Sequence, residues 1–173
     1  GEDPYRRALE HFRDLLKPDG VLVLAIENKF GLKYFASSAE DHTATMFDGI
    51  EGYPRFPDRA RTFGYTELRD QLQQYFSNLR FFFPCPDYKV PACVVSETML
   101  DKVDVAELVG SVRPRDYGRV SRPRLFDERL AWFEISANRM IPEFANSYLV
   151  LADNGANQSI SADWLGICFS NAR

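Results

Sequence analysis

The chain has 173 residues, of which 45% are hydrophobic and 27% are charged, with 10 glycines and 10 prolines. This composition excludes disordered, collagen-like and coiled-coil proteins, and a chain of this length buries roughly 70% of its unfolded surface, enough for a core without metals or disulfides. The formal net charge of −4 argues against nucleic-acid binding, because phosphate contacts require a clustered excess of lysine and arginine. The arginines from Arg113 to Arg124 are diluted by Asp116 and the nearby Asp127.

The three cysteines, Cys85, Cys93 and Cys168, are odd in number and lack the spacing of metal ligands. They predict reduced thiols in a cytoplasmic protein and no disulfide framework. The longest uninterrupted apolar run, 21–26, is far shorter than the ~18 residues that a membrane span needs, and no segment resembles a signal peptide. The helical start and the apolar segment before Arg173 are typical of a piece of a longer polypeptide.

The chain opens with a predicted helix and strand. Asp3 is a good N-cap, Pro4 suits the first helical position, and apolar side chains recur at helical spacing, which predicts a helix over 4–16. The turn 17–20 ends this helix. The apolar run 21–26 lacks polar alternation, which is typical of a strand covered on both faces in a mainly parallel sheet.

A long segment over 30–63 follows, with a helical pattern only at its start. Long connections of this kind are usually lids or binding loops, and the alternative is a packed excursion held by Phe47, Tyr53 and Phe56. The remaining elements predicted up to residue 97 are a helix over 64–76 and strands over 79–83 and 92–96.

The second half begins with a predicted connector over 98–124, which shows little periodicity. Asp127 is a candidate cap of a helix that stops at Pro142. Helical spacing predicts an apolar face on this helix, formed by Leu130, Phe133, Ala137 and Ile141. Strands are predicted over 147–152 and 164–169. The chain is thus divided into an α/β unit over 1–97, the connector over 98–124, and an extension with a helix and a strand pair over 125–173.

Several motifs in the first unit carry a resemblance to a known family. The helix, turn and strand over 12–26 resemble the middle of class I S-adenosylmethionine-dependent methyltransferases, where they form the fifth strand and its lead-in. The motifs at 26–35, 40–43 and 47–53 are similar to a bacterial branch associated with cell-surface polysaccharide synthesis and sometimes joined to glycosyltransferase modules. The resemblance covers residues 4–97 and, less specifically, 144–147. It implies an α/β fold with a partial Rossmann-like methyltransferase sheet, its last three strands with flanking helices, followed by a small α+β extension.

The chain departs from this family at the donor side. A complete class I methyltransferase begins with a strand and a glycine-rich turn that approaches the donor, and no Gly-x-Gly occurs in this chain. The resemblance therefore implies that the S-adenosylmethionine pocket lies mostly outside these residues and that the chain alone is inactive. The strand over 21–26 would lack a neighbour, and an unpaired apolar edge invites either a homodimer or pairing with later segments of the chain.

The candidate catalytic residues are His42 and Glu27. The carboxylate of Asp41 could orient the imidazole of His42 as the base for an acceptor hydroxyl, and the structural alternative is a surface loop histidine. Glu27, with Asn28 and Lys29, follows the strand over 21–26, where open α/β sheets place their ligands. A capped strand end is the alternative for these three residues.

Asp48, Asp87 and Tyr88 are candidate contacts to a sugar-like acceptor, because carboxylates bind hydroxyls and an aromatic face packs on a sugar ring. Ordinary turn chemistry is their structural alternative. The carboxylates and the two histidines lack metal-ligand spacing, so no metal site is predicted, and no residue is assigned to the cofactor. The predicted substrate-binding set is completed by Asn28, Lys29 and Asp41.

Two functions remain open at this point. The chain is either the substrate-side part of a methyltransferase that acts on a carbohydrate or another small acceptor in the intact protein, or a non-catalytic α/β interaction module that positions a neighbouring glycosyltransferase domain. The arginine-rich connector and the second unit fit the module. A glycine-rich turn after a strand in an upstream segment would favour the enzyme, and its absence would favour the module.

Overall fold

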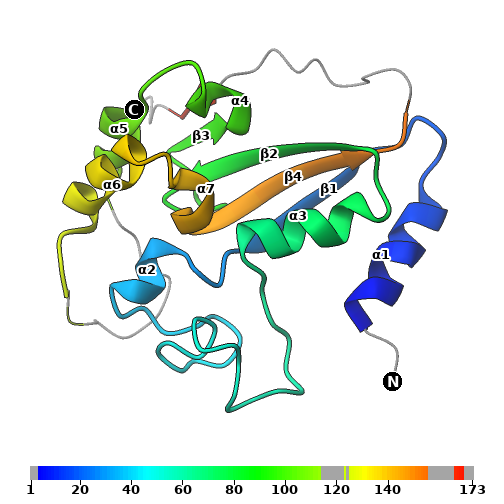
Figure 1. Ribbon diagram of the computed structural model, residues 1–173, viewed down its shortest axis with the longest axis horizontal. Coiled ribbons are helices and arrows are strands. Elements are labelled where there is room, and N and C mark those ends of the chain that lie inside the picture. Colours follow the sequence, from blue (N-terminus) through cyan, green and yellow to red (C-terminus); the bar gives the residue numbers. More distant parts are fainter. Residues whose placement is uncertain (1–3, 114–122, 124, 156–165, 170–173) are drawn as a thin grey trace.

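The computed structural model describes residues 4–113, 123, 125–155 and 166–169. The described part is built on one five-stranded sheet surrounded by helices (Figure 1), which confirms the predicted α/β class. The strands are β1 (Leu22–Glu27), β2 (Asn78–Cys85), β3 (Cys93–Ser96), β4 (Ser147–Asp153) and β5 (Gly166–Cys168), and the sheet order is β1-β4-β2-β3-β5. The helices are α1 (Pro4–Leu15), α2 (Leu32–Phe35), α3 (Tyr65–Gln73), α4 (Glu97–Leu100), α5 (Ala106–Gly110), α6 (Glu128–Ala137) and α7 (Ile141–Phe144).

β1 lies at one end of this sheet and not among parallel neighbours. It pairs antiparallel with β4, in a register that runs from Leu22 opposite Ala152 to Glu27 opposite Ser147. Its residues alternate in burial, and Val23 is 61% exposed. The prediction of a strand covered on both faces in a mainly parallel sheet is therefore wrong, because an apolar run does not report which strands will lie beside it. Pairing with a later segment of the chain, one of the two expected outcomes, is found on one edge of β1.

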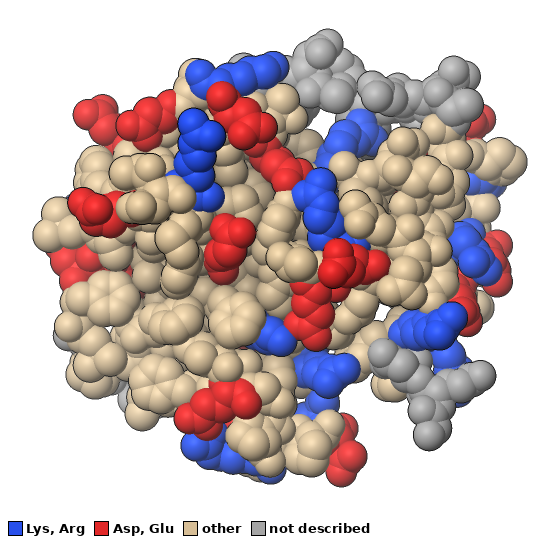
Figure 2. All heavy atoms as spheres, in the orientation of Figure 1, with Lys and Arg blue, Asp and Glu red and all other residues tan. Residues whose placement is uncertain are grey.

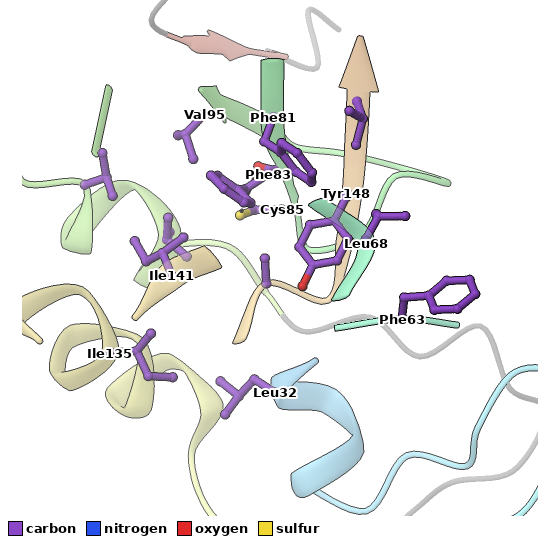
Figure 3. Close-up of a cluster of buried hydrophobic side chains, with 14 of the residues drawn as sticks. Leu32, Phe63, Leu68, Phe81, Phe83, Cys85, Val95, Ile135, Ile141 and Tyr148 are labelled. Atoms are coloured by element: carbon purple, nitrogen blue, oxygen red, sulfur yellow. Dashed lines mark hydrogen bonds between the residues drawn. The ribbon is translucent and has the colours of Figure 1, made fainter. Parts of the chain in front are cut away.

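β4 connects the two halves of the chain. It comes from the segment predicted as an extension, yet it lies between β1 and β2 and pairs antiparallel with both. The side chains of Tyr148, Val150 and Ala152 are completely buried on one of its faces. Tyr148 meets the rings of Phe81 and Phe83 in edge-on contacts, with ring centroids 6.0 Å and 6.3 Å apart. Figure 3 shows Tyr148, Phe81 and Phe83 close together in the cluster of buried hydrophobic side chains.

The helix after Asp127 forms as predicted but buries a different face. Asp127 caps α6 by accepting a hydrogen bond from the backbone N–H of Arg129 (3.0 Å). The buried apolar side chains of α6 are Trp132 and Ile135, whereas Leu130, expected in the core, is 66% exposed. The predicted apolar face is thus wrong, because α6 packs against α5 and its rotation follows that contact. The helix also ends before Pro142, which lies in the first turn of α7.

The long segment between α2 and α3 is folded against itself. The Tyr53 side chain is buried, and its hydroxyl lies 2.8 Å from the hydroxyl of Thr62, accepts from the Thr62 backbone N–H (2.9 Å) and lies 3.3 Å from Glu40 Oε1. Of the three aromatic residues expected to hold a packed excursion, Tyr53 does so, whereas Phe47 lies at the surface. In the described part of the chain, no helix is long and apolar enough to cross a membrane.

Candidate functional site

A group of polar side chains gathers where β1 ends. It joins the last residue of β1 to α2, to the loop after α2 and to the loop between β2 and β3. We call this group the Glu27 cluster, and its members are Glu27, Lys33, Tyr34, Asp41, Asp87, Tyr88 and Lys89. Four of the predicted site residues meet here, namely Glu27, Asp41, Asp87 and Tyr88.

Lys33 lies at the centre of the Glu27 cluster. Its Nζ atom is 3.0 Å from Asp41 Oδ2 and 3.0 Å from Asp87 Oδ2, and its side chain is only 8% exposed. The hydroxyl of Tyr34 donates to the same Asp41 Oδ2 (2.7 Å). A buried charge is stable only when it is paired and hydrogen-bonded. Lys33 therefore ties together two carboxylates that come from distant loops.

Lys89 holds the other side of the cluster. Its Nζ atom is 2.5 Å from Glu27 Oε1 and 3.6 Å from Asp41 Oδ1, and its backbone N–H donates to Asp87 Oδ1 (3.1 Å). The hydroxyl of Tyr88 also donates to Glu27 Oε1 (3.3 Å). Three carboxylates thus face two ammonium groups, which leaves one negative charge in excess. Such a site favours ligand groups that donate hydrogen bonds, such as hydroxyls.

Four members of the cluster have shifted pKa values. Burial acts to raise the pKa of Asp41, but the adjacent ammonium group and the hydroxyl of Tyr34 outweigh it and hold that pKa below its usual value. Burial and the charge of Asp41 raise the pKa of Tyr34, and burial together with Glu27 raises that of Tyr88. Burial acts to lower the pKa of Lys89, but its bond to Glu27 outweighs this and raises it. At neutral pH the tyrosines are therefore proton donors beside an ionised carboxylate and a charged lysine.

Asn146 fixes the elements that carry the cluster. Its Oδ1 accepts from the backbone N–H of Lys33 (2.9 Å), and its Nδ2 donates to the carbonyl of Pro86 (2.9 Å). A Cβ atom at Gly31 would lie 2.9 Å from Asn146 Cα, so α2 approaches this closely because residue 31 is a glycine. The next residue, Ser147, accepts from the backbone N–H of Tyr88 (2.9 Å). The segment before β4 thus sets the spacing between α2 and the loop that follows β2.

Two predicted substrate-binding residues next to Glu27 lie outside the cluster. Asn28 is fully buried, and its Nδ2 donates to the carbonyls of Glu143 (2.7 Å) and Ala145 (2.8 Å). Lys29 Nζ lies 2.5 Å from a carboxylate oxygen of Glu67 on α3. Asn28 therefore joins the end of β1 to the segment before β4, and Lys29 joins it to α3.

His42 and Asp48 also occupy positions apart from the cluster. His42 is exposed, and its backbone N–H donates to Glu40 Oε2 (2.7 Å), whereas the neighbouring Asp41 directs its carboxylate into the cluster. Asp48 is completely buried, with Oδ1 3.3 Å from Arg55. Within the described residues, its Oδ2 has no hydrogen-bond partner.

Sequence reasoning missed the residues that organise the cluster, above all Lys33, Lys89 and Asn146. The available signal was a lysine at position 33 between Leu32 and Tyr34, because a charge inside an apolar helical turn needs a partner. No spacing rule connects position 33 to position 87, since the two meet only through the fold.

Comparison of the chain with protein-family models, with curated proteins and with solved structures finds no match. The geometry of the described residues therefore carries the functional argument. On the face of the molecule seen in Figure 2, basic and acidic side chains lie intermixed.

Proposed function

We propose that this chain is the acceptor side of an S-adenosylmethionine-dependent methyltransferase that acts on a hydroxyl of a carbohydrate or another small molecule. The observation that carries the proposal is the Glu27 cluster, which assembles polar groups from four separate segments at the carboxyl end of β1. This is the end of the strand at which open α/β sheets bind their ligands.

The chemistry of the cluster suits a polyhydroxylated acceptor. Its carboxylates accept hydrogen bonds from hydroxyls, and the ring of Tyr88 offers an apolar face to a sugar ring. In this proposal Glu27 takes the proton of the attacking hydroxyl, because it ends β1 and Lys89 and Tyr88 hold its Oε1 in place. A positioned base and an in-line nucleophile are what methyl transfer to oxygen requires. S-adenosylmethionine would supply the methyl group, and we assign no residue of this chain to it, since the chain has no glycine-rich turn.

The finer fold proposal is that the sheet is the closing part of a Rossmann-like methyltransferase sheet. Because β1 and β2 each pair antiparallel with β4, they run in the same direction on its two sides. Several apolar side chains of α1 and β1 are exposed, among them Phe12, Leu15 and Val23. Further strands beside β1, with the helices that pack on them, would cover these residues.

The proposal is tested with the chain produced together with the sequence that precedes Gly1 in its gene. Calorimetric titration with S-adenosylhomocysteine should show binding by the longer protein and none by the chain alone. Methyl transfer from labelled donor to a panel of sugars should then fall by about 10²-fold or more in Glu27→Gln. Glu67→Gln, which changes a carboxylate outside the cluster, should keep its rate. Absence of donor binding by both proteins would contradict the proposal.

The exposed apolar residues favour a second candidate function, that of an interaction module. Phe12, Leu15 and Val23 lie on α1 and β1, and β1 is the last strand at its end of the described sheet. A glycosyltransferase module or a second copy of the chain could occupy this surface. A stable complex through β1, weakened by Val23→Lys, together with absence of donor binding by the longer protein, would support the module over the enzyme.

A further inference from the structure

The three cysteines, far apart in sequence, form one row across neighbouring strands. The register of β2 and β3 places Cys85 opposite Cys93, and the register of β3 and β5 places Cys93 opposite Cys168. Directly opposed residues of antiparallel strands share one face of the sheet, with Cα atoms ~4.5–5.5 Å apart. Disulfides span Cα separations of ~4.4–6.8 Å. Cys93 is therefore within bonding reach of a cysteine on either side.

The row runs from the core to the surface. Cys85 is buried, Cys93 is 1% exposed and Cys168 is exposed. A cavity of about 320 Å³ has Cys93 and Cys168 in its lining together with apolar residues of the surrounding loops and of α5, and Arg113 is also in this lining. A small molecule that enters this cavity thus meets an exposed thiol first and a buried thiol behind it.

The environments of the two inner thiols differ in a way that favours Cys93 as a nucleophile. The Cys85 thiol donates to the carbonyl oxygen of Phe83 (3.7 Å). Its contact with Cys93 lowers the pKa of Cys93. The same contact, together with burial, raises the pKa of Cys85. Because the thiolate is the reactive form and Cys93, unlike Cys85, lines the cavity, Cys93 is the better nucleophile of the two.

We propose that Cys168 and Cys93 form a thiol–disulfide exchange site whose substrate is a small-molecule disulfide. The Cys168 thiolate attacks one sulfur of the substrate, which forms a mixed disulfide and releases one thiolate. The Cys93 thiolate then attacks the Cys168 sulfur, which forms the Cys93–Cys168 disulfide and releases the second thiolate. The two cysteines lose two protons and two electrons, and the substrate becomes two thiols. Cys85 is absent from the lining of the cavity, its thiol donates to the carbonyl of Phe83, and it does not enter the disulfide.

The test uses the reduced full chain and glutathione disulfide. After free thiols have been alkylated, intact-protein and peptide mass spectrometry should show a Cys93–Cys168 linkage and no retained glutathione. In Cys93→Ser the reaction should stop at a glutathione adduct on Cys168. In Cys168→Ser the oxidation of Cys93 should slow by about 10-fold or more, because buried thiols react slowly.

Cys85→Ala is the matched control, because it removes the third thiol and leaves the proposed pair. It should form the same Cys93–Cys168 linkage, and circular dichroism should verify that each variant is folded. A stable adduct on Cys168 in the wild-type chain would overturn the proposal. A Cys85–Cys93 linkage, or an unchanged rate in Cys168→Ser, would do the same.

Discussion

β4 and β1 are both apolar strands of one sheet, yet β4 is more deeply buried than β1. β4 lies between two partners, and its residues Tyr148 and Val150 are completely buried. β1 lies at the end of the sheet, and Val23 in its middle, which the register places on the opposite face from Val150, is mostly exposed. The sequences of the two strands give no hint of this difference. Burial is set by the neighbours that a strand acquires, and its own apolar content is only a precondition.

The carboxyl end of β1 is an exception within the edge strand. Glu27 and the following Asn28 are as buried as the centre of β4, because α2 and the loops on both sides close over them. The one place where β1 becomes interior is thus the place where its polar residues are. The candidate site therefore lies where the exposed part of β1 meets its covered end.

The largest expected effect is at this boundary. Lys33→Met removes the ammonium group between Asp41 and Asp87 and leaves a buried carboxylate unpaired, which should lower the free energy of unfolding by about 3 to 5 kcal/mol. Lys29→Met, which breaks the more exposed pair with Glu67, should cost under about 1 kcal/mol. Urea unfolding followed by circular dichroism measures both. Equal costs would mean that the ion pairs of Lys33 are no more shielded from solvent than the pair between Lys29 and Glu67.

The next effect compares the two strands directly. Val150→Ala should lower the free energy of unfolding by about 2 kcal/mol, because it removes buried methyl groups and leaves a cavity beneath α3. Val23→Ala makes the same chemical change on β1 and should cost less than about 0.5 kcal/mol. The same unfolding measurement applies. A similar loss in both variants would show that β1 is covered in solution, for example by a second copy of the chain.

A smaller effect is expected from one hydroxyl of β4. The Tyr148 hydroxyl donates to the carbonyl of Pro142 (3.0 Å). Burial raises the pKa of this tyrosine, so the hydroxyl keeps the proton that it donates. Tyr148→Phe keeps the ring and should lower the free energy of unfolding by about 1 kcal/mol. Amide exchange should show whether α7 loosens first. An unchanged stability would indicate that water replaces the lost donor.

The smallest effect concerns pH. The pKa of Asp41 is lowered in the folded chain, so the unfolded chain binds its proton first as the pH falls. Its stabilising contribution is therefore complete above the ordinary aspartate pKa of about 3.9 and is lost as the pH falls through the lower folded value. The stability difference between the wild-type chain and Asp41→Asn should shrink over that acidic range. A difference that grows toward acid would contradict the assigned direction.

Local patterns in the sequence predicted much of the secondary structure. The helix over 4–16 forms as α1 over Pro4–Leu15, and the strand over 147–152 forms as β4 over Ser147–Asp153. Asp127 caps α6 as expected. Each of these features depends on residues within a few positions of one another, through helical spacing, capping or an apolar run. Within the candidate strand over 164–169, residues 166–169 are described, and β5 covers Gly166–Cys168.

The sequence by itself determined where the longer helices and the strands form and that polar groups follow β1, because these depend on contacts between near neighbours in the chain. It did not predict the short helices α4 and α5, which lie in the segment expected to be a connector. Only the tertiary structure decided that β4 pairs with β1, that Lys33 joins Asp41 to Asp87, and that the cysteines form a row. The partners in β1 and β4 are more than a hundred positions apart, Leu22 opposite Ala152 for example. The physical reason is that such pairings are selected by the burial of the whole core, in which every segment competes for the same neighbours.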